Sequence, residues 1–546
     1  MFTGCVFDSL EILRDKNTAS DGTVLVTVGM PEAVPQTRIS FEENGLDVDL
    51  VWQAGDQIDL LIVYGTEQKK ETVTVIVDGT NKKKATFSLP LPVGDYETFD
   101  LYGVYGGGGL DNTNPRLVKL PTYAQSTSSS LKEIGKNKGL VLVFLEKGIN
   151  KSAPTLSFEF EHIGSLFNIQ VKNIGTNTLD KVTEARLTAS STIPAYSNSG
   201  TETYDVTTGT FSGSQPTRLT FLPISSSNIV SQGILEFWAW VPMERGGATG
   251  AAWPALGLQI VSDRVDITTT TTKDARYATV GKTYCLYATY DGSALDFATE
   301  AEMTVAAGKL ADFRDGNLYN TVTIGSQTWM QENLAYLPAV TSPGFSLIIP
   351  YYFVIGNTYT VVGIAKNTDN YKTYGALYNW CAMMAGEASS ASNPSGVQGV
   401  CPTGWHLPSD AEWTQMEAYL ANHGYNYDGS IGYDSSSYHG PREKIAKSLA
   451  TDYGWKYDNG TLGEVGNTLY PGYRNKSGFS ALPGNGITGY FPEQNREYGY
   501  WWTCTEREQD YAYSRRIHYW YSSVERLSTG TYATAGFSVR CIKDKD

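Results

Sequence analysis

The chain has 546 residues, of which 41% are hydrophobic and only 18% are charged, and its formal net charge is −15. This negative charge argues against binding to nucleic acid, whose phosphates require a basic face, and against polybasic attachment to anionic lipid. Many glycines and tyrosines with few charges are typical of β-rich extracellular domains, and the length allows about three or four domains.

The first twenty residues are expected to be a leader. They begin Met1-Phe-Thr-Gly-Cys5, and a small residue before a cysteine resembles the end of a bacterial lipoprotein signal, in which that cysteine becomes lipidated. Cys5 is therefore a candidate lipidation site that would attach the chain to an outer membrane. The apolar stretch expected before it is missing, and the alternative is an incidental cysteine. No apolar run approaches the ~20 residues that span a bilayer.

Residues 21–152 are predicted to form an antiparallel β-sandwich. Val24, Val26 and Val28 recur at every second position, which is the period of a strand with one buried face. Residues 48–63 read as two strands around an Ala-Gly-Asp turn, and no helical pattern competes with this interpretation.

A second β-sandwich is predicted over residues 153–300, after the polar loop 148–154. Its clearest strand patterns cover 156–171, 233–241 and 284–290. Cys285 lies within an alternating pattern, so we expect it to be a small buried hydrophobic residue rather than a partner in a disulfide.

Short motifs in this part of the chain resemble the fimbrillin-like proteins of Bacteroidales. Residues 37–41 and 51–58 are similar to the opening of their first domain, and residues 158–162 and 281–284 to the start and the closing strand of their second domain. The resemblance covers about residues 20–300. It implies two transthyretin-like sandwiches, export as a lipoprotein and assembly into a pilus.

The same resemblance implies a processing step. In many members a protease cuts after an arginine beyond the first strand, this strand leaves, and a donor strand from another subunit fills the groove. Arg38 matches that arginine and follows a proline-containing stretch that is not expected in a central strand. Arg14 is an alternative site, and an ordinary surface arginine is the other interpretation of Arg38.

The C-terminal part contains a helix with a clear start signal. Ser409 and Glu412 form a predicted capping box, and Trp413, Met416 and Leu420 then share one face of the helix. Residues 404–408 are predicted to form a short buried strand. Cys401 precedes this strand and Cys541 lies near the end of the sequence; a bridge between them would close a loop of ~140 residues and stabilise the fold by about 5 kcal/mol.

These residues resemble a bacterial extracellular family, the Fibrobacter succinogenes major paralogous domain. The similar blocks, within residues 305–546, are 315–334, 374–380, 477–480, 501–506 and 536–541. The resemblance implies a C-type-lectin-like α+β domain over 301–546, a helix at about 374–385 and a Cys401–Cys541 bridge. A second bridge between Cys381 and Cys504 is the pairing we expect, although four cysteines allow three connectivities.

No pattern predicts catalysis or a cofactor. The five histidines lack metal-ligand spacing, no phosphate-binding loop occurs, and calcium ligands of C-type lectins are missing from 491–493 and 502–504. One enzymatic alternative is a formylglycine-generating fold, since the unit 404–420 also resembles it. That activity requires a reactive cysteine pair near the C-terminus, whereas Cys504 and Cys541 are far apart in sequence.

Two polar segments rich in tyrosine, residues 425–439 and 485–498, are predicted to be loops. Tyrosine among small polar residues is typical of binding loops, and the alternative is a solvated loop whose tyrosines cover the core. The candidate ligand-binding residues are Tyr425, Tyr427, Asp428, Tyr433, Asp434, Tyr438, Tyr490 and Tyr498.

The sequence therefore predicts a mainly β, secreted cell-adhesion protein at the tip of a fimbria. It would accept a strand from a shaft or adaptor subunit and meet a host glycan, a host protein or a bacterial surface with its head. A final strand bridged through Cys541 could not be donated to a neighbour. The alternatives are an outer-membrane lipoprotein adhesin that does not polymerise, a structural cap or anchor without a ligand, and the enzyme named above.

Overall fold

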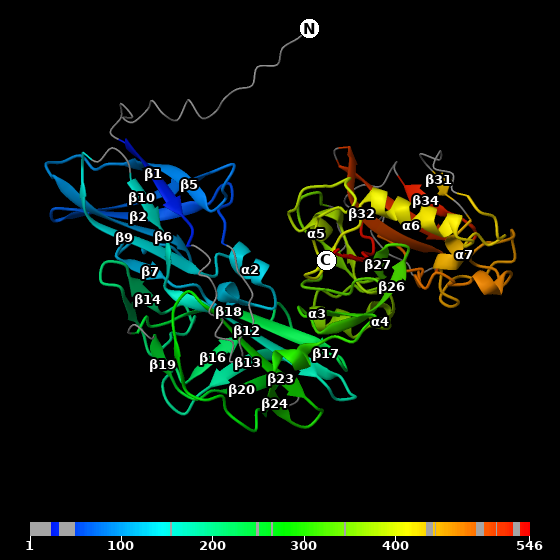
Figure 1. Cartoon of the computed structure of the whole chain (residues 1–546), viewed down its shortest axis with the longest axis horizontal. Helices are drawn as coiled ribbons and strands as arrows, with labels where there is room; N and C mark the ends of the chain where they lie inside the picture. Colours follow the sequence, from blue (N-terminus) through cyan, green and yellow to red (C-terminus); the bar gives the residue numbers. More distant parts are fainter. Residues whose placement is uncertain are drawn as a thin grey trace, which may run out of the picture. The chain divides into compact units, whose positions relative to one another are not determined.

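The computed structural model of the chain is mainly β, which confirms the predicted fold class (Figure 1). The residues that the structure describes are 23–31, 50–152, 156–246, 250–263, 266–342, 346–432, 440–442, 444–487, 496–508, 510–527 and 535–545. They divide into two compact units. The first comprises the described residues up to Met303 other than 173–182 and 225–235, and those two segments group with the residues from Thr304 onward in the second unit.

The N-terminal sandwich consists of one mixed sheet and one antiparallel sheet with one shared core. Their strand orders are β10-β1-β5-β4 and β11-β9-β6-β2-β3. The bounds are β1 Thr23–Gly29, β2 Gln57–Tyr64, β3 Glu67–Thr74, β4 Ile76–Val77, β5 Lys84–Pro90, β6 Thr98–Gly106, β9 Val141–Asn150, β10 Leu156–Glu159 and β11 Glu161–His162. Residues 156–162 are expected in the second sandwich from the sequence, whereas β10 and β11 pair with β1 and β9 of the first.

The strand β1 lies inside its sheet and not at an edge. It pairs in parallel with β10, from Val26 opposite Leu156 to Gly29 opposite Glu159, and antiparallel with β5 along its whole length. Val26 and Val28 are completely buried, as the alternation of apolar residues predicts. β1 therefore completes both the hydrogen bonding and the core of this sandwich.

The second sandwich also has two main sheets, with orders β24-β23-β12-β18-β8 and β16-β13-β20-β21, and β17 pairs with β13. The bounds are β8 Thr127–Ser128, β12 Gly164–Asn173, β13 Leu179–Thr188, β16 Arg218–Phe221, β17 Ser227–Ile229, β18 Ile234–Pro242, β20 Gly257–Ser262, β21 Asp266–Thr268, β23 Thr283–Tyr290 and β24 Leu295–Ala298. Phe167 stacks between Trp253 and Tyr284 in its core, with ring centroids 5.3 and 5.0 Å away. Cys285 is buried, as expected.

Short elements complete this part of the chain. Two small sheets have the orders β15-β14-β7 and β19-β22. The bounds are β7 Leu117–Lys119, β14 Thr203–Asp205, β15 Thr210–Ser212, β19 Ala251–Trp253, β22 Arg276–Ala278, α1 Tyr123–Ser126, α2 Leu131–Lys136 and the 3-10 turn Glu300–Met303.

The C-terminal unit combines helices with three sheets, of orders β25-β26-β27-β35-β30, β28-β29 and β31-β34-β33-β32. The strands are β25 Lys309–Asp312, β26 Asn317–Ile324, β27 Gln327–Met330, β28 Tyr352–Phe353, β29 Leu377–Tyr378, β30 Trp405–His406, β31 Gly440–Arg442, β32 Tyr498–Glu508, β33 Tyr511–His518, β34 Val524–Leu527 and β35 Ile542–Lys543. The helices are α3 Val362–Lys366, α4 Asp369–Tyr374, α5 Trp380–Met384, α6 Asp410–Asn422, α7 Ala446–Leu449 and the 3-10 turn Pro471–Tyr473.

The predicted strand before α6 and α6 itself are present, but the helix expected over 374–385 is shorter. Gly375, with φ of 73°, ends α4, and the next residues form β29. Asn379 then caps α5 by accepting a hydrogen bond from the Ala382 N–H. The positive φ of Gly375 prevents α4 from continuing into the expected range, so within 374–385 only the second half contains a helix, α5. No helix in the described ranges is long and apolar enough to cross a membrane.

Candidate functional site

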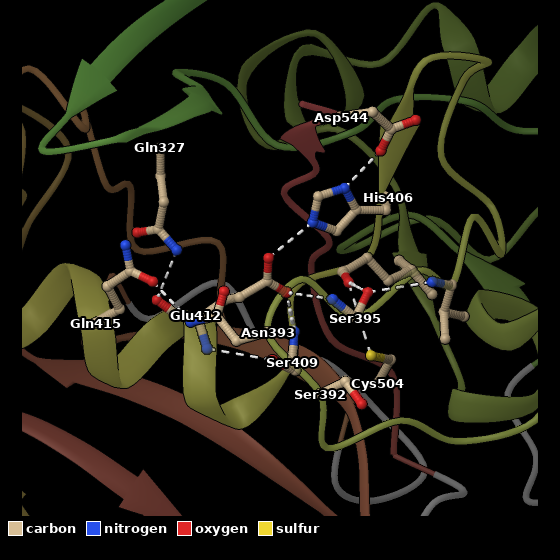
Figure 2. A network of polar contacts seen from close by, with 12 residues as sticks. Gln327, Ser392, Asn393, Ser395, His406, Ser409, Glu412, Gln415, Cys504 and Asp544 are labelled. Carbon is tan, nitrogen blue, oxygen red and sulfur yellow. Dashed lines mark hydrogen bonds and ion pairs between the residues drawn. The ribbon is translucent and has the colours of Figure 1, made fainter. Parts of the chain in front are cut away.

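The start of α6 is held by the predicted capping box (Figure 2). The Ser409 Oγ accepts a hydrogen bond from the Glu412 N–H at 3.1 Å, and the Glu412 Oε2 accepts one from the Ser409 N–H at 2.9 Å. The Gln327 Nε2 on β27 donates to the Glu412 carbonyl at 3.0 Å. Two backbone N–H groups that the helix leaves without partners are thus satisfied, and α6 is attached to the neighbouring sheet.

The same carboxylate connects α6 to β30. His406 lies between Glu412 and Asp544, with Nε2 2.8 Å from the Glu412 Oε1 and Nδ1 2.6 Å from the Asp544 Oδ1 (Figure 2). Burial opposes the charged imidazolium, but the hydrogen bonds and charges of Glu412 and Asp544 outweigh burial and raise the pKa of His406. We interpret this group as structural, because it joins three segments of the fold.

A disulfide joins Cys401 to Cys541 across 140 residues of sequence, with a Cα–Cα distance of 6.0 Å. This pairing is the one implied by the family resemblance. The strand that follows Cys541 is β35, which lies between β27 and β30 in its sheet. The end of the described chain is therefore held by covalent and hydrogen bonds.

The second bridge, expected between Cys381 and Cys504, is not formed, and this prediction is wrong: both residues carry thiols. The preceding residue, Trp380, makes the contact between α5 and β32, because its Nε1 donates to the Thr503 carbonyl at 3.2 Å. Burial raises the pKa of Cys504 to about 12, so a thiolate is disfavoured at neutral pH. With Cys541 in a disulfide, the reactive pair of the formylglycine-generating alternative is not present in this structure.

One face of the sheet β31-β34-β33-β32 is closed by α6, which packs against β32 (Figure 1). Arg515 on β33 is completely buried there, with Nε 2.5 Å from Glu417 and Nη1 2.8 Å from Asp410. Arg526 on β34 contacts the second oxygen of Asp410 at 2.6 Å. Although burial acts in the opposite direction, the two arginines lower the pKa of Asp410 to about 2.

The opposite face of this sheet carries a cluster of aromatic rings. Tyr498 on β32 pairs with His518 on β33, and Tyr500 on β32 pairs with Arg516. Because residues two apart on a strand point to the same side, these four side chains share the face that α6 does not cover. The turn after β33 adds Trp520 and Tyr521. We call Tyr498, Tyr500, His518, Trp520 and Tyr521 the aromatic face.

His518 is the centre of the aromatic face. Its ring centroid lies 4.4 Å from Tyr498, 4.7 Å from Trp520 and 5.0 Å from Tyr521, and Tyr498 is 5.7 Å from Tyr500. His518 is buried, the two strand tyrosines are half-buried, and Trp520 and Tyr521 are 46% and 42% exposed. The exposed rings thus rest on a buried aromatic base.

The charges beside the aromatic face are paired. The Arg516 guanidinium donates from Nε and Nη2 to the two oxygens of Glu525, at 2.6 and 2.8 Å, and lies 5.6 Å from the Tyr498 ring. Lys456 is 2.5 Å from Glu497. Burial and the positive charge of Arg516 lower the pKa of His518 to about 4, so its ring is neutral at pH 7.

Three of the predicted ligand-binding residues lie in the loop after α6 and contact other parts of the C-terminal unit. Tyr425 packs against the hydrophobic core that includes Trp413 and Leu420 of α6. The Tyr427 ring is 5.0 Å from that of Tyr470, and Asp428 is 2.5 Å from the Lys444 ammonium. These contacts are of the kind that the alternative, a loop whose tyrosines cover the core, predicts. A role of these residues in binding stays a prediction.

Of the other candidates, Tyr498 lies in the aromatic face. The remaining ligand-binding candidates (Tyr433, Asp434, Tyr438 and Tyr490), the lipidation candidate Cys5 and the processing candidates Arg14 and Arg38 lie outside the described residues. Sequence reasoning missed His518, Trp520 and Tyr521. The available signal was their run, His518-Tyr-Trp-Tyr521, which joins two strand patterns by a turn made of aromatic residues.

Within the described ranges, no group of three or more His, Cys, Asp and Glu side chains could hold a metal ion. Trp502, Thr503 and Cys504, which the resemblance to C-type lectins would place at one of the two calcium positions, are all buried. The aromatic face is therefore the candidate site, and its chemistry is that of flat apolar rings beside paired charges.

Residues 322–543 match the family described as the Fibrobacter succinogenes major domain. This match confirms the resemblance of the C-terminal part to that family, over slightly fewer residues than the sequence analysis proposed. No curated protein matches the chain.

Several solved structures from Bacteroidales align with about half of the chain. A candidate cell adhesion protein from Bacteroides uniformis shares 15% identity with a TM-score of 0.31, over 52% of this chain and 97% of its own. A candidate cell adhesion protein from Bacteroides fragilis shares 10% identity with a TM-score of 0.30, over 52% of this chain and 99% of its own. The tip fimbrial protein Mfa3 from Porphyromonas gingivalis shares 9% identity with a TM-score of 0.27, over 50% of this chain and 97% of its own. Likenesses this weak carry no argument about this chain.

Proposed function

We propose that this chain is a cell-surface adhesin at the tip of a fimbria. It accepts a donor strand at its N-terminal sandwich and presents a C-type-lectin-like head to a ligand on a host or bacterial surface. The observation that supports this function best is the contrast between two strands. β1 occupies a place in a sheet that another strand could take, whereas β35 is bound inside the head.

The position of β1 suits strand replacement. It separates β10 from β5, so its departure would leave two unpaired strand edges and a groove in the core. Val26 and Val28 fill this groove, and the burial of each contributes roughly 1.5–3 kcal/mol. An incoming strand with alternating apolar residues would restore both the hydrogen bonds and the core.

The position of β1 also separates the two candidate processing sites. β1 spans Thr23–Gly29, so cleavage after Arg38 would release it, whereas cleavage after Arg14 would leave it attached. Only the first cut produces an acceptor groove. Of the two candidate sites, only Arg38 is therefore compatible with the function as a strand acceptor.

The other strand, β35, is not available for donation. It pairs with β27 on one side and β30 on the other. Cys541 immediately before it is bridged to Cys401, and Asp544 immediately after it contacts His406. A subunit that receives a strand but retains β35 fits the end of a polymer, where a head domain would meet a ligand. Its partner would be a shaft or adaptor subunit.

The intact mass and N-terminal sequence of the protein taken from its native cell surface test this proposal. A new N-terminus immediately after Arg38, in material that co-purifies with pili, supports it. A chain that begins at an acylated Cys5 and retains β1 would rule out strand acceptance and leave a membrane-held adhesin. An Arg38→Ala variant serves as the matched control, since it should remain uncleaved and outside the pili.

A further inference from the structure

We propose that the aromatic face binds uncharged carbohydrate chains without calcium, through stacking of sugar rings on Trp520, Tyr521 and Tyr498. The inference rests on the proposed function as an adhesin, for which it names the ligand class. None of the patterns in the sequence assigned a ligand to Trp520 or Tyr521.

Two neighbouring rings of the aromatic face are exposed to solvent. A single exposed aromatic side chain is ordinary, but Trp520 and Tyr521 are both about half exposed and both contact the same buried ring, His518. A pyranose ring presents C–H groups on its two faces and hydroxyl groups around its rim. The C–H groups can stack on flat aromatic rings, while the hydroxyl groups require hydrogen-bond donors and acceptors beside those rings.

Polar groups lie beside the rings of the aromatic face. Tyr498 and Tyr500 each carry a hydroxyl that can donate and accept, and they lie beside the Arg516–Glu525 pair. A guanidinium has five N–H donors, and Glu525 takes two of them. A planar donor group and a carboxylate side by side match the adjacent hydroxyls of a sugar.

The charges around the aromatic face favour uncharged sugars. Arg516 and Lys456 are each held by a carboxylate, and His518 is neutral at pH 7. The Arg496 guanidinium donates instead to the Gly454 carbonyl, at 2.6 Å. An acidic sugar would have to compete with a carboxylate for Arg516 or Lys456, whereas an uncharged sugar would not.

The turn that carries the exposed rings is held by contacts of its own backbone. The Tyr521 N–H donates to the His518 carbonyl at 3.1 Å, which closes the turn, and the Trp520 N–H lies 3.4 Å from the His518 Nδ1. His518 thus contacts the backbone of the turn as well as the two exposed rings, which are tilted against its imidazole by 56° and 44°. Because these side chains are positioned before a ligand arrives, binding would cost little conformational entropy.

Binding of the full-length chain to an array of oligosaccharides, in buffer with EDTA, tests the inference. The probes end in glucose, galactose or N-acetylglucosamine, and each is paired with a sialylated or sulfated version. We expect binding to uncharged probes that EDTA does not change, and no gain from the added acidic group.

Two variants connect binding to the aromatic face. Trp520→Ala should weaken binding to the best uncharged probe by about tenfold or more, as for other well-packed aromatic anchors, and Trp520→Phe should retain most of it. Tyr277→Ala removes a tyrosine that is 58% exposed on β22 of the other unit, and it should leave binding unchanged. An unchanged melting temperature of Trp520→Ala shows that the loss is local.

The inference is overturned if the folded chain binds no uncharged probe, if EDTA abolishes binding, if only acidic probes bind, or if Trp520→Ala binds as the unaltered chain does. The inference is also overturned if the chain binds a protein ligand equally well with and without Trp520→Ala and binds no oligosaccharide on the array. These failures are distinct from failure of the proposed function. A chain cut after Arg38 and found in pili keeps that function even if no sugar binds.

Discussion

His406 and Asp544 are 138 residues apart in the sequence, yet the Nδ1 of His406 lies 2.6 Å from the Oδ1 of Asp544. The Nε2 of His406 contacts Glu412 at the start of α6. A single imidazole thus connects the strand before α6, the helix itself and the segment after β35. Together with the Cys401–Cys541 bridge, this arrangement supports the interpretation that β35 cannot leave the head.

We predict that His406 makes the head more stable at mildly acidic pH. The pKa of His406 is raised in the folded state, so its contribution is complete below the unfolded value, about 6.5, and is lost as the pH rises through the folded value. At pH 6, His406→Gln should lower the free energy of unfolding by about 2 kcal/mol, the size expected for hydrogen bonds between charged groups. Thermal melts from pH 5 to 9 should show the two curves converging as the pH rises.

A matched control for this prediction is His423→Gln, at the exposed C-terminal end of α6. Its imidazole lies near solvent and contacts Tyr419, so at pH 6 this variant should change the melting temperature less than His406→Gln does. A difference between His406→Gln and the unaltered chain that grew with pH would contradict the assignment of a charged His406.

The disulfide should carry a large share of the stability of the C-terminal unit. Because it closes 140 residues, loss of the bridge in a Cys401→Ser, Cys541→Ser double variant should lower the free energy of unfolding by about 5 kcal/mol in the chain-entropy model, or by 2–5 kcal/mol on general experience. Urea titration monitored by tryptophan fluorescence measures the change. Cys381→Ser is the control, and a comparable loss in that variant would mean that Cys381 forms a bridge after all.

Asp410 should protect the fold against acid. Its folded pKa of about 2 lies below the unfolded value of about 3.9, so its contribution is present above pH 4 and is lost as the pH falls toward 2. Asp410→Asn leaves Arg515 and Arg526 without this partner in a buried place and should cost about 3 kcal/mol at pH 7.

Asp428→Asn is the matched control, because Asp428 also pairs with a cation but lies near solvent. Surface pairs contribute about 0–1 kcal/mol, so this variant should differ little from the unaltered chain in urea titration at pH 7. If Asp410→Asn lowered the free energy of unfolding as little as Asp428→Asn does, the buried arginines would have found other partners.

Removal of β1 should create a site for a peptide. A chain that lacks residues 1–38 should melt at a lower temperature in its N-terminal sandwich, and a synthetic peptide of residues 20–32 should restore the transition, because it rebuilds the pairs with β5 and β10. The same peptide with Val26→Asp and Val28→Asp should not, since it would bury two charges. Equal rescue by both peptides would exclude specific strand insertion.

Features that depend on neighbouring residues were predictable. The capping box of Ser409 and Glu412 and the alternation of Val26 and Val28 each depend on contacts within a few residues, and both are present. The prediction of one helix over 374–385 was wrong because the sequence does not show the backbone conformation of Gly375. Gly375 has a φ of 73° and ends α4, and the strand that follows, β29, pairs with β28.

Cysteine pairing and strand pairing required the tertiary structure. Cys381 and Cys504 looked like partners by count, but Trp380 makes the contact with β32 and the two thiols stay separate. β10 reads as the start of a second domain in sequence, yet it completes the sheet of the first. Partners distant in sequence are selected by geometry that composition and spacing do not encode.

The sequence by itself determined the capping box of α6, the alternation in β1, the mainly β class and the similarity of the C-terminal part to a known family, because these follow from residue periodicity, capping and short motifs. The tertiary structure alone decided that β1 is an interior strand, that β35 is locked, and that Tyr498, His518 and Trp520 share one face. The physical reason is that strand register sets which side chains meet. A shift of one residue would move Tyr498 to the opposite face of its sheet and away from His518.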